Sequence, residues 1–292
     1  MKKLLTMTMA LALVVSLAAC GGGNSGSTSS KGSAGPSSSQ GSTSGSAGGS
    51  ASSGQQGDSA FTTVEAGKLH MSTNAAFPPY EMTTASGSFE GIDVEVAAAI
   101  ADKLGLVLVV DDMGFDAALT AAQTGKSDIA MAGITITDDR LEVMDFSDSY
   151  ATGVQVVIVR EDSPIQSIDD LDSAEMIGCQ KATTGYIYAS DTPENGGYGE
   201  DHVTAYDTGA LAVMALVNGQ IDAVIIDNEP AKSFVSLNEG LKILDGTWVE
   251  EDYAIGVAKG NTALLEAINS AMAELKAEGT FQQIVDKYIT AD

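Results

Sequence analysis

Residues 91–110 read GIDVEVAAAIADKLGLVLVV, and this stretch decides the class of fold. From Ile92 to Leu104 the apolar residues recur every four positions, which is the spacing of one helical face, and Gly105 is typical of the residue that follows a helix. Leu106 to Val110 is a continuous apolar run, which predicts a strand buried on both faces. A helix that leads directly into a strand is the repeating unit of an α/β fold.

The segments around this stretch continue the alternation of strands and helices. Lys68 to Thr73 alternates in polarity like a strand, and Phe115 to Gln123 has the pattern of a helix. Asp128 to Gly133 predicts a further strand, whereas Phe77 to Tyr80 is expected to be irregular because consecutive prolines forbid a ladder. This order of elements predicts a parallel α/β unit.

The same pattern repeats after about residue 150 and predicts a second unit of similar size. Its strands, and the one that follows it, are expected at Val154–Val159, Met176–Cys179, Ile221–Ile226 and Tyr253–Ala258. The further helices are expected at Ser167–Leu171, from Ala182 onward, at Gly209–Asn218, after Asp227, at Thr262–Glu278 and at Thr280–Tyr288. The last two helices are available to return to the first unit.

The N-terminus has the pattern of a secretory signal, with two lysines before an apolar stretch from Leu4 to Ala19. The stretch ends in small residues before Cys20, which resembles a bacterial lipobox. We therefore expect residues 1–19 to be a signal peptide and Cys20 to be lipidated after cleavage. The alternative, a single-pass transmembrane anchor, needs roughly 20 apolar residues.

Residues 21–60 are almost wholly Gly and Ser, and Lys31 and Asp58 are their only charged residues. Such a segment cannot bury a core, so residues 20–60 are expected to be a lipidated cysteine followed by a disordered tether. As a Gly/Ser coil its ends would lie about 35 Å apart. The folded part therefore begins at Phe61.

Charge and composition disfavour several kinds of partner and chemistry. The net charge of −26 disfavours nucleic acid and anionic membrane surfaces as partners. Apart from Cys20 the only cysteine is Cys179, which lies in an apolar run, so core packing is favoured over a nucleophilic role and no intramolecular disulfide is expected. His70 and His202 have no Cys or His at ligand spacing, so neither a metal site, a catalytic triad nor a cofactor is indicated.

Chemically distinctive residues follow the strands of both units. Arg140 is one of only two arginines in the chain, and it follows the same strand as Thr135. Thr184 lies at a helix start and Asp227 directly after another strand. Ligands of such sheets bind beyond the carboxyl ends of the strands. A guanidinium binds a carboxylate bidentately and an acid pairs with an ammonium, so the set fits an α-amino acid.

Each of these residues also has a structural interpretation. Arg140 would form a surface salt bridge with a neighbouring aspartate, whereas Asp227 and the Thr183–Thr184 turn would cap helices. Phe77 and Phe115 are the aromatic residues next to these strand ends. They would either clamp a ligand side chain or pack in the core.

At these positions the chain resembles the family 3 solute-binding proteins of bacterial amino-acid ABC transporters, which have the type II periplasmic-binding-protein fold. The resemblance covers about Leu69 to Tyr288, and the family signature is matched from Gly91 to Leu104 at each specified position. The further matches are Phe77–Glu81, Thr135–Thr137 with Arg140, Asp145–Tyr150, Thr183–Thr184, Asp222–Val224 with Asp227, and Gly279–Phe281 before Lys287–Tyr288.

The resemblance implies an α/β fold of two lobes, each a mostly parallel sheet flanked by helices, joined by two hinge strands. Residues 61–151 and 252–292 would form one lobe and residues 152–251 the other. The hinge strands would cross near Ala151 to Gly153 and near Asp252. Closure of the lobes would bury the ligand between them.

The resemblance also implies how the ligand's head group is held. Arg140 would bind its carboxylate with the help of Thr135. Backbone N–H groups near Gly133 and Thr184 would assist, and Asp227 would bind the ammonium.

The ligand's side chain would meet a different set of residues. Phe77 and Phe115 would lie against it, and Asn74 stands where family members that bind cationic side chains often have Asp, which favours a neutral polar side chain. Ala182 stands where Gly is common, which would alter the turn before Thr184. Further residues that would shape the pocket are Tyr186, Gln180 and Met131.

The expected function is that of a monomeric, lipid-anchored receptor outside the cytoplasm that delivers an amino acid to an ABC import permease. It is not expected to be an enzyme. One alternative is a sensory or adhesion lipoprotein. The other is an enzyme like cyclohexadienyl dehydratase on the same fold, with Glu81 or Glu229 as general acid.

Overall fold

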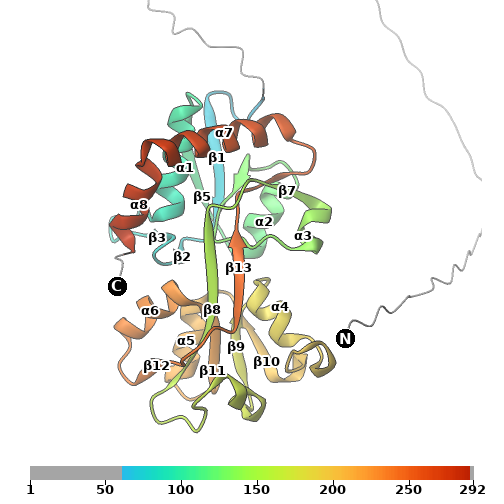
Figure 1. The fold of residues 1–292 in the computed structure, drawn as a ribbon, viewed down its shortest axis with the longest axis vertical. Helices are drawn as coiled ribbons and strands as arrows, with labels where there is room; N and C mark the ends of the chain where they lie inside the picture. The colour runs from blue at the N-terminus through green and yellow to red at the C-terminus, as the bar shows by residue number, and fades with distance from the viewer. Residues whose placement is uncertain (1–60, 290–292) are drawn as a thin grey trace, which may run out of the picture. The chain divides into compact units, whose positions relative to one another are not determined.

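The computed structural model describes residues 61–289. The predicted signal peptide, Cys20 and the whole tether lie outside the described residues, as do residues 290–292. Within the described part, two α/β lobes are joined by the strands β8 (Ala151–Arg160) and β13 (Val249–Tyr253) (Figure 1). The predicted two-lobed α/β architecture is confirmed.

The first lobe contains a five-stranded sheet in the order β5-β1-β6-β14-β7. Its strands are β1 (Lys68–Thr73), β5 (Val107–Asp112), β6 (Ile129–Ala130), β7 (Met144–Phe146) and β14 (Gly256–Ala258). Strand β1 is parallel to β5 and β6, whereas β14 is antiparallel to β6 and β7. Its helices are α1 (Ile92–Lys103), α2 (Phe115–Gln123), α3 (Asp138–Val143), α7 (Thr262–Glu278) and α8 (Thr280–Tyr288).

The last two helices return to the first lobe, as the sequence predicts. Ile268 and Met272 of α7 and Phe281 of α8 belong to the same buried cluster as Val96 and Ile100 of α1. In Figure 1, α7 and α8 lie beside α1 at the top of the molecule. Segments far apart in the sequence therefore build one core.

The second lobe contains a sheet in the order β10-β9-β11-β8-β12, and β13 also pairs with β8. Its other strands are β9 (Ile177–Gln180), β10 (Val203–Tyr206), β11 (Ala223–Asp227) and β12 (Leu241–Ile243). Strand β9 is parallel to β10 and β11, whereas β8 is antiparallel to its partners. Its helices are α4 (Thr184–Ser190), α5 (Gly209–Val217) and α6 (Asn228–Leu237), with short 3₁₀ helices at Ile168–Ser173, Pro193–Asn195 and Glu200–His202.

Strands β8 and β13 form an antiparallel ladder between the lobes, in which Glu251 lies opposite Gly153 and Tyr253 opposite Ala151. Tyr253 also forms a bridge with Thr135 of the first lobe. A Cβ at Gly153 would lie 2.4 Å from the Tyr253 ring, so glycine leaves the space that this ring occupies. The ladder thus fixes Tyr253 where the two lobes meet.

Two contacts explain the stretch that begins at Gly91. Gly91 has φ 132°, and a Cβ there would lie 2.2 Å from the carbonyl oxygen of Tyr80, so only glycine fits. Asp93 is fully buried and accepts hydrogen bonds from the Gly133 N–H (3.0 Å) and the Tyr150 hydroxyl (2.8 Å). Helix α1 therefore holds the loop that follows β6.

Several local predictions differ from the structure. The expectation that the strand after Gly105 is buried on both faces is wrong, because β5 is the edge of its sheet and Val107 is 66% exposed. Strand β6 has only two residues, and the strand expected at 253–258 is divided between β13 and β14. Phe77, expected to be irregular, pairs with Glu81 before the chain turns at the prolines. This pairing belongs to a small sheet of β2 (Ala76–Phe77), β3 (Glu81–Thr83) and β4 (Phe89–Glu90).

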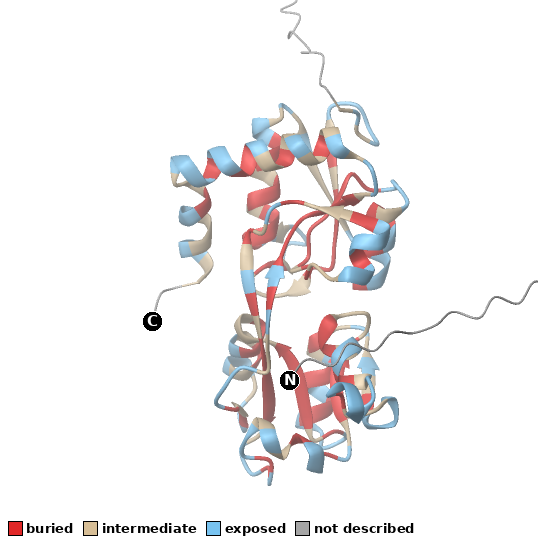
Figure 2. Cartoon of the chain, turned by 45° about the vertical axis from the view of Figure 1, so that its right-hand side comes forward, coloured by how far each residue is buried: buried red, intermediate tan, exposed pale blue. Residues whose placement is uncertain are grey.

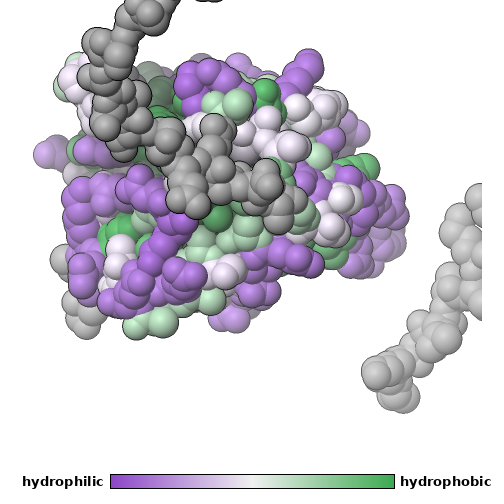
Figure 3. Space-filling model, turned by 90° about the horizontal axis from the view of Figure 1, so that it is seen from above, coloured by the Kyte–Doolittle hydropathy of each residue, from purple (hydrophilic) through white to green (hydrophobic). Residues whose placement is uncertain are grey.

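Burial follows the sheets in both lobes. Figure 2 shows buried residues concentrated in the central strands and exposed residues on outer helix faces and loops. The first lobe seen from above presents mainly hydrophilic side chains with smaller hydrophobic areas between them (Figure 3). Across residues 61–289, none of the helices has the length and apolar character that crossing a membrane requires.

Candidate functional site

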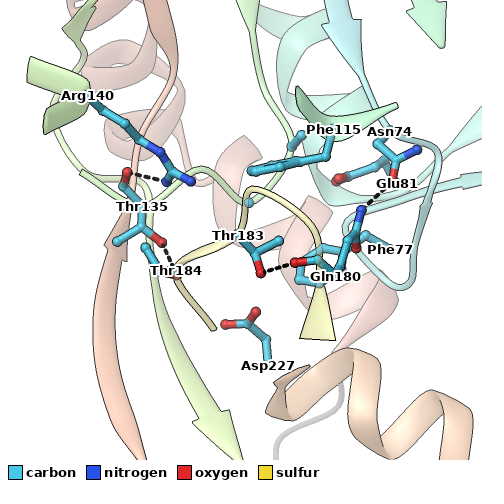
Figure 4. A pocket seen from close by; sticks show the side chains of 12 residues that line it. Asn74, Phe77, Glu81, Phe115, Thr135, Arg140, Gln180, Thr183, Thr184 and Asp227 are labelled. Atoms are coloured by element: carbon cyan, nitrogen blue, oxygen red, sulfur yellow. Dashed lines mark hydrogen bonds between the residues drawn. The ribbon is translucent and has the colours of Figure 1, made fainter. Parts of the chain in front are cut away.

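A pocket lies between the two lobes, at the carboxyl ends of strands and the loops that follow them (Figure 4). It contains about 360 Å³ of empty space, part of which is open to solvent. Its lining residues are Asn74, Phe77, Glu81, Phe115, Ala132, Gly133, Thr135, Arg140, Gln180, Thr183, Thr184 and Asp227. The structure thus brings together all eight residues that the sequence assigns to ligand binding, and their role in binding stays a prediction.

Arg140 on α3 is only 7% exposed, so its interpretation as a surface salt bridge is wrong. Its backbone N–H donates to the Thr137 side chain, which caps α3 as predicted. Its guanidinium donates from Nη1 to the Thr135 carbonyl oxygen (2.8 Å) and from Nη2 to the Ala182 carbonyl oxygen of the second lobe (3.0 Å). The guanidinium carbon lies 5.6 Å from the centre of the Phe115 ring. Burial lowers the pKa of Arg140, and within the described chain its guanidinium forms no salt bridge.

The two threonines that open α4 have different roles. Thr183 is the capping residue, and its side chain accepts a hydrogen bond from the Tyr186 N–H (3.3 Å). Thr184 does not cap the helix; its buried hydroxyl donates to the Glu251 carboxylate (2.9 Å). The capping interpretation therefore holds for Thr183 alone.

Asp227 occupies the N-cap position of α6, but its side chain makes no capping hydrogen bond. Its carboxylate instead accepts a hydrogen bond from the Tyr253 hydroxyl and lines the pocket. Burial raises the pKa of Asp227 to about 7, although the Tyr253 hydrogen bond acts in the opposite direction. The capping interpretation of Asp227 is thus wrong, and its carboxyl group faces the pocket from the side opposite Arg140 (Figure 4).

Aromatic rings form the walls of the first lobe's side of the pocket. Phe115 begins α2, and Phe77 lies in β2 with its ring centre 5.7 Å from that of Tyr80. Gly133 has φ 54°, and a Cβ there would lie 2.8 Å from Phe77 Cε1. A glycine is therefore needed for the loop to pass beside the Phe77 ring.

A fully buried acid, Glu81, also lines the pocket. Its carboxyl hydrogen-bonds to the Asp93 carboxyl when one of the two is protonated, and no other residue among 61–289 bonds to its oxygens. Burial and the neighbouring Asp93 carboxylate raise the pKa of Glu81 well above its usual range. Burial also raises the pKa of Asp93, to about 6, while the Gly133 N–H and the Tyr150 hydroxyl oppose that shift. The proton shared by the pair therefore resides on Glu81 rather than on Asp93.

Three polar contacts span the pocket from one lobe to the other. Gln180 Nε2 donates to Asn74 Oδ1 (2.9 Å), and Asn74 Nδ2 donates to the Met113 carbonyl oxygen (2.9 Å). The second is the contact of Arg140 with Ala182, and the third joins the Thr135 and Thr184 hydroxyls (3.5 Å). Among the described residues, Ala182 is the one non-glycine with positive φ (61°), which explains why glycine would be favourable at this position.

Sequence reasoning did not assign Glu81, Ala132, Gln180 and Thr183 to ligand binding. Gln180 was a candidate for shaping the pocket, and it lies there, whereas Tyr186 and Met131 are absent from the lining. Met131 is fully buried in the core of the first lobe. The signal that identifies Glu81 is its place in the Phe77–Glu81 match, since β2 and β3 fold it back beside Phe77.

The remaining reactive groups lie elsewhere. Cys179 is a free thiol buried in the second lobe's core, and burial raises its pKa to about 12, so it packs as an apolar residue. His70 contacts Asp111 (2.8 Å) and Glu65 (3.4 Å) near the sheet edge, away from the pocket. Across residues 61–289 there is no group of three His, Cys, Asp or Glu residues arranged to hold a metal ion.

The sequence also matches a known family. Residues 69–291 match the bacterial extracellular solute-binding proteins, family 3. The chain belongs to this family. As a family 3 solute-binding protein it shares the fold and the motifs that the sequence predicts, with its pocket between the two lobes.

Individual relatives of this solute-binding protein bind amino acids. The arginine-binding extracellular protein ArtP of Bacillus subtilis is 28% identical over 296 residues, which span 100% of both chains. The ABC transporter arginine-binding protein 1 of Escherichia coli is 28% identical over 233 residues, 78% of this chain and 93% of that protein. The solved structure of an ancestral arginine-binding protein bound to glutamine has a TM-score of 0.71 and 36% identity, and the match covers 77% of this chain and 99% of that one. These relatives are binding proteins rather than enzymes.

Proposed function

We propose that this chain binds a free α-amino acid with a neutral polar side chain between its lobes and delivers it to an ABC-type import permease. The observation that carries the proposal is the buried Arg140 guanidinium, which lines the pocket and has no salt-bridge partner among residues 61–289. A buried charge is unfavourable unless it is paired. An α-carboxylate would supply the partner for Arg140, and the α-ammonium would supply the partner for Asp227.

The neutral side chain is supported by the polar groups at the Asn74 end of the pocket. Asn74 and Gln180 carry amides that both donate and accept hydrogen bonds. A protonated Glu81 also both donates and accepts, and its raised pKa favours that form. An amide side chain such as that of glutamine would complement these groups, and glutamine is the ligand bound in the ancestral relative.

Glu81 also favours a second candidate, an amino acid with a cationic side chain such as arginine. Apart from the Asp93 carboxyl, its oxygens have no hydrogen-bond partner within residues 61–289, and a guanidinium would bind the ionised carboxylate bidentately. All three relatives named above are arginine-binding proteins. Because binding a cation would ionise Glu81, it would release a proton, whereas binding of glutamine at this group would not.

Isothermal titration calorimetry with glutamine, arginine and matched analogues tests the proposal. Glutaramic acid and 4-aminobutanamide are glutamine without its α-amino group and without its α-carboxylate, respectively. We expect each deletion to weaken binding by about 100-fold or more, because one buried charge is left unpaired. For arginine, 5-guanidinovaleric acid lacks the α-amino group and agmatine lacks the α-carboxylate. An analogue without the α-carboxylate that binds as tightly as its parent amino acid would refute the assignment of Arg140.

The variant Glu81→Gln separates the two candidates. If the ligand is neutral, the variant should bind glutamine within about threefold of the wild type, since a Gln amide replaces a protonated carboxyl. If the ligand is arginine, its affinity should fall by about 100-fold, because the buried guanidinium loses its counter-charge. Asp111→Asn, outside the pocket, is the control for general effects of removing an acid.

The proposal includes attachment to the outer face of the membrane by a lipid on Cys20, with residues 20–60 as a tether and the folded part as a monomer. The alternative is a receptor that senses the amino acid without transporting it. Uptake of the labelled amino acid in cells with and without the gene distinguishes these functions. Unchanged uptake together with intact binding would favour sensing.

A further inference from the structure

The buried carboxylate of Glu251 lies on the hinge strand β13 and is not one of the residues that line the pocket. We propose that Glu251 is a latch that stabilises the closed arrangement of the two lobes, an inference that rests on the proposed binding of a ligand between them. It acts as a positioning residue, since it would act on the ligand through other side chains.

One oxygen atom of Glu251 accepts hydrogen bonds from residues of both lobes. Oε2 accepts from Thr135 Oγ1 of the first lobe (3.0 Å) and from Thr184 Oγ1 of the second lobe (2.9 Å). Gln155 Nε2, on the other hinge strand, donates to the same oxygen (2.9 Å) and to Thr184 Oγ1 (2.9 Å). The carboxylate therefore joins two lobes and two hinge strands at a single point.

The surrounding backbone is shaped for this contact. A Cβ at Gly185 would lie 2.8 Å from Gln155 Oε1, so the glycine allows Gln155 to approach the start of α4. Glu251, Gln155 and Thr184 are all buried. Hydrogen bonds to an ionised acceptor are stronger than those between neutral groups, and their loss leaves a buried charge without partners.

Ligand entry requires this arrangement to open. Thr135 and Thr184 line the pocket but are buried, so a ligand of amino-acid size reaches them only when the lobes move apart. Because their hydroxyls belong to different lobes, separation removes at least one of them from Glu251 Oε2. The complete set of hydrogen bonds is therefore a property of the closed state alone.

The other contacts between the lobes differ from this one. In the Arg140 and Gln180 contacts the charged or amide group itself lines the pocket and would turn to a ligand, whereas the Glu251 carboxylate does not line it. Lys181 and Asp116 form an ion pair at 3.5 Å, but both side chains are well exposed and solvent weakens such pairs. Glu251 also opposes the effect of burial on Arg140, whose pKa it raises.

Fluorescence energy transfer between dyes on the two lobes tests the latch. Val107→Cys and Leu237→Cys are exposed sites in the first and second lobes; Cys20 is replaced by Ser, and Cys179 is buried. The full chain carrying these changes is compared with Glu251→Ala, Glu251→Gln and the matched control Glu250→Ala, whose side chain is exposed on the same strand. Glu251→Gln keeps one acceptor oxygen at this position.

We expect Glu251→Ala to shift the ligand-free population toward the open form and to raise the apparent Kd of the amino acid by about tenfold. The affinity should fall mainly through faster dissociation, and Glu251→Gln should restore part of the closed population. If the ligand-free populations of Glu251→Ala and Glu250→Ala are the same, the latch is refuted. If the wild type binds no amino acid, the proposed function fails, while the ligand-free comparison still decides the latch.

Discussion

The two lobes contribute unequally to the pocket. The first lobe supplies eight of the lining residues, among them Arg140, both phenylalanines and Glu81, whereas the second supplies four, with Asp227 as its only acid. The first lobe therefore carries the groups suited to the ligand's carboxylate and side chain, and the second carries the group suited to its ammonium. This difference indicates that a ligand would dock on the first lobe, and the second would complete its binding.

The pocket loops of the two lobes also differ in backbone conformation. Both have a residue in the left-handed region, but the first lobe places Gly133 there and the second places Ala182. The loop of the first lobe therefore has no backbone strain at Gly133. The second holds a strained residue, whose carbonyl oxygen is the contact for Arg140 in the other lobe.

The largest expected effect comes from Arg140→Ala, which removes the cation that the first lobe contributes to the pocket. Amino-acid binding should weaken by about 1000-fold or more, because the ligand's buried carboxylate loses its counter-charge. Calorimetry measures the change. Arg160→Lys is the matched control, since Arg160 lies in the second lobe and bonds the carbonyl oxygens of Leu216 and Ile221. Retention of wild-type affinity in Arg140→Ala would show that Arg140 does not bind the ligand's carboxylate.

A smaller effect is expected for Asp227→Asn, which removes the acid that the second lobe contributes to the pocket. Affinity should fall by about 100-fold at pH 8. In the wild type, whose Asp227 has a pKa raised to about 7, the ligand ammonium favours the ionised carboxyl. Affinity should therefore weaken as the pH falls below 7, by about tenfold per pH unit. In the variant this dependence should be absent.

The raised pKa of Asp227 also makes the stability of the ligand-free protein depend on pH. A carboxyl whose pKa is raised on folding makes the ligand-free protein more stable at low pH, and this contribution is lost as the pH rises through the folded pKa. Asp227→Asn should therefore be more stable than the wild type at pH 8 and equal to it near pH 4 in thermal unfolding without ligand. Equal melting curves at both pH values would contradict the raised pKa.

The smallest effect is expected for Ala182→Gly, which removes the difference between the two loops. The free energy of unfolding should rise by about 0.5 to 1 kcal/mol, because relief of the left-handed strain outweighs the greater freedom of glycine in the unfolded chain. Urea unfolding measures it. The reverse change, Gly133→Ala, should destabilise the protein, since its Cβ would meet the Phe77 ring. A loss of stability in Ala182→Gly would contradict this account.

The sequence was most informative at positions where the local backbone geometry accepts only one kind of residue. Gly91 has no space for a Cβ, Gly105 ends α1 with φ 69°, and Thr137 caps α3, so these positions were predictable locally. The positions of Arg140, Thr184 and Asp227 at the pocket were also predictable, since these residues follow strand ends. Apolar content alone could not distinguish the edge strand β5 from a central one, because that depends on which neighbours pair with it.

The residues that sequence reasoning missed depend on contacts between distant segments. Glu81 reaches the pocket because β3 folds back on β2, and its carboxyl meets Asp93 of α1. Glu251 looks like any acid in a polar strand, and its neighbours Glu250 and Asp252 are exposed. Only the alignment of β13 with β8 brings it to Gln155 and to threonines of both lobes.

The return of α7 and α8 to the first lobe has a consequence for the order of folding. The buried cluster of the first lobe includes both Leu69 and Phe281, whereas a cluster of the second lobe lies between Val156 and Leu241. A chain that emerges from its N-terminus can complete the second cluster before the last helices exist. The first lobe must wait for nearly the whole chain, because its core closes over a long sequence separation.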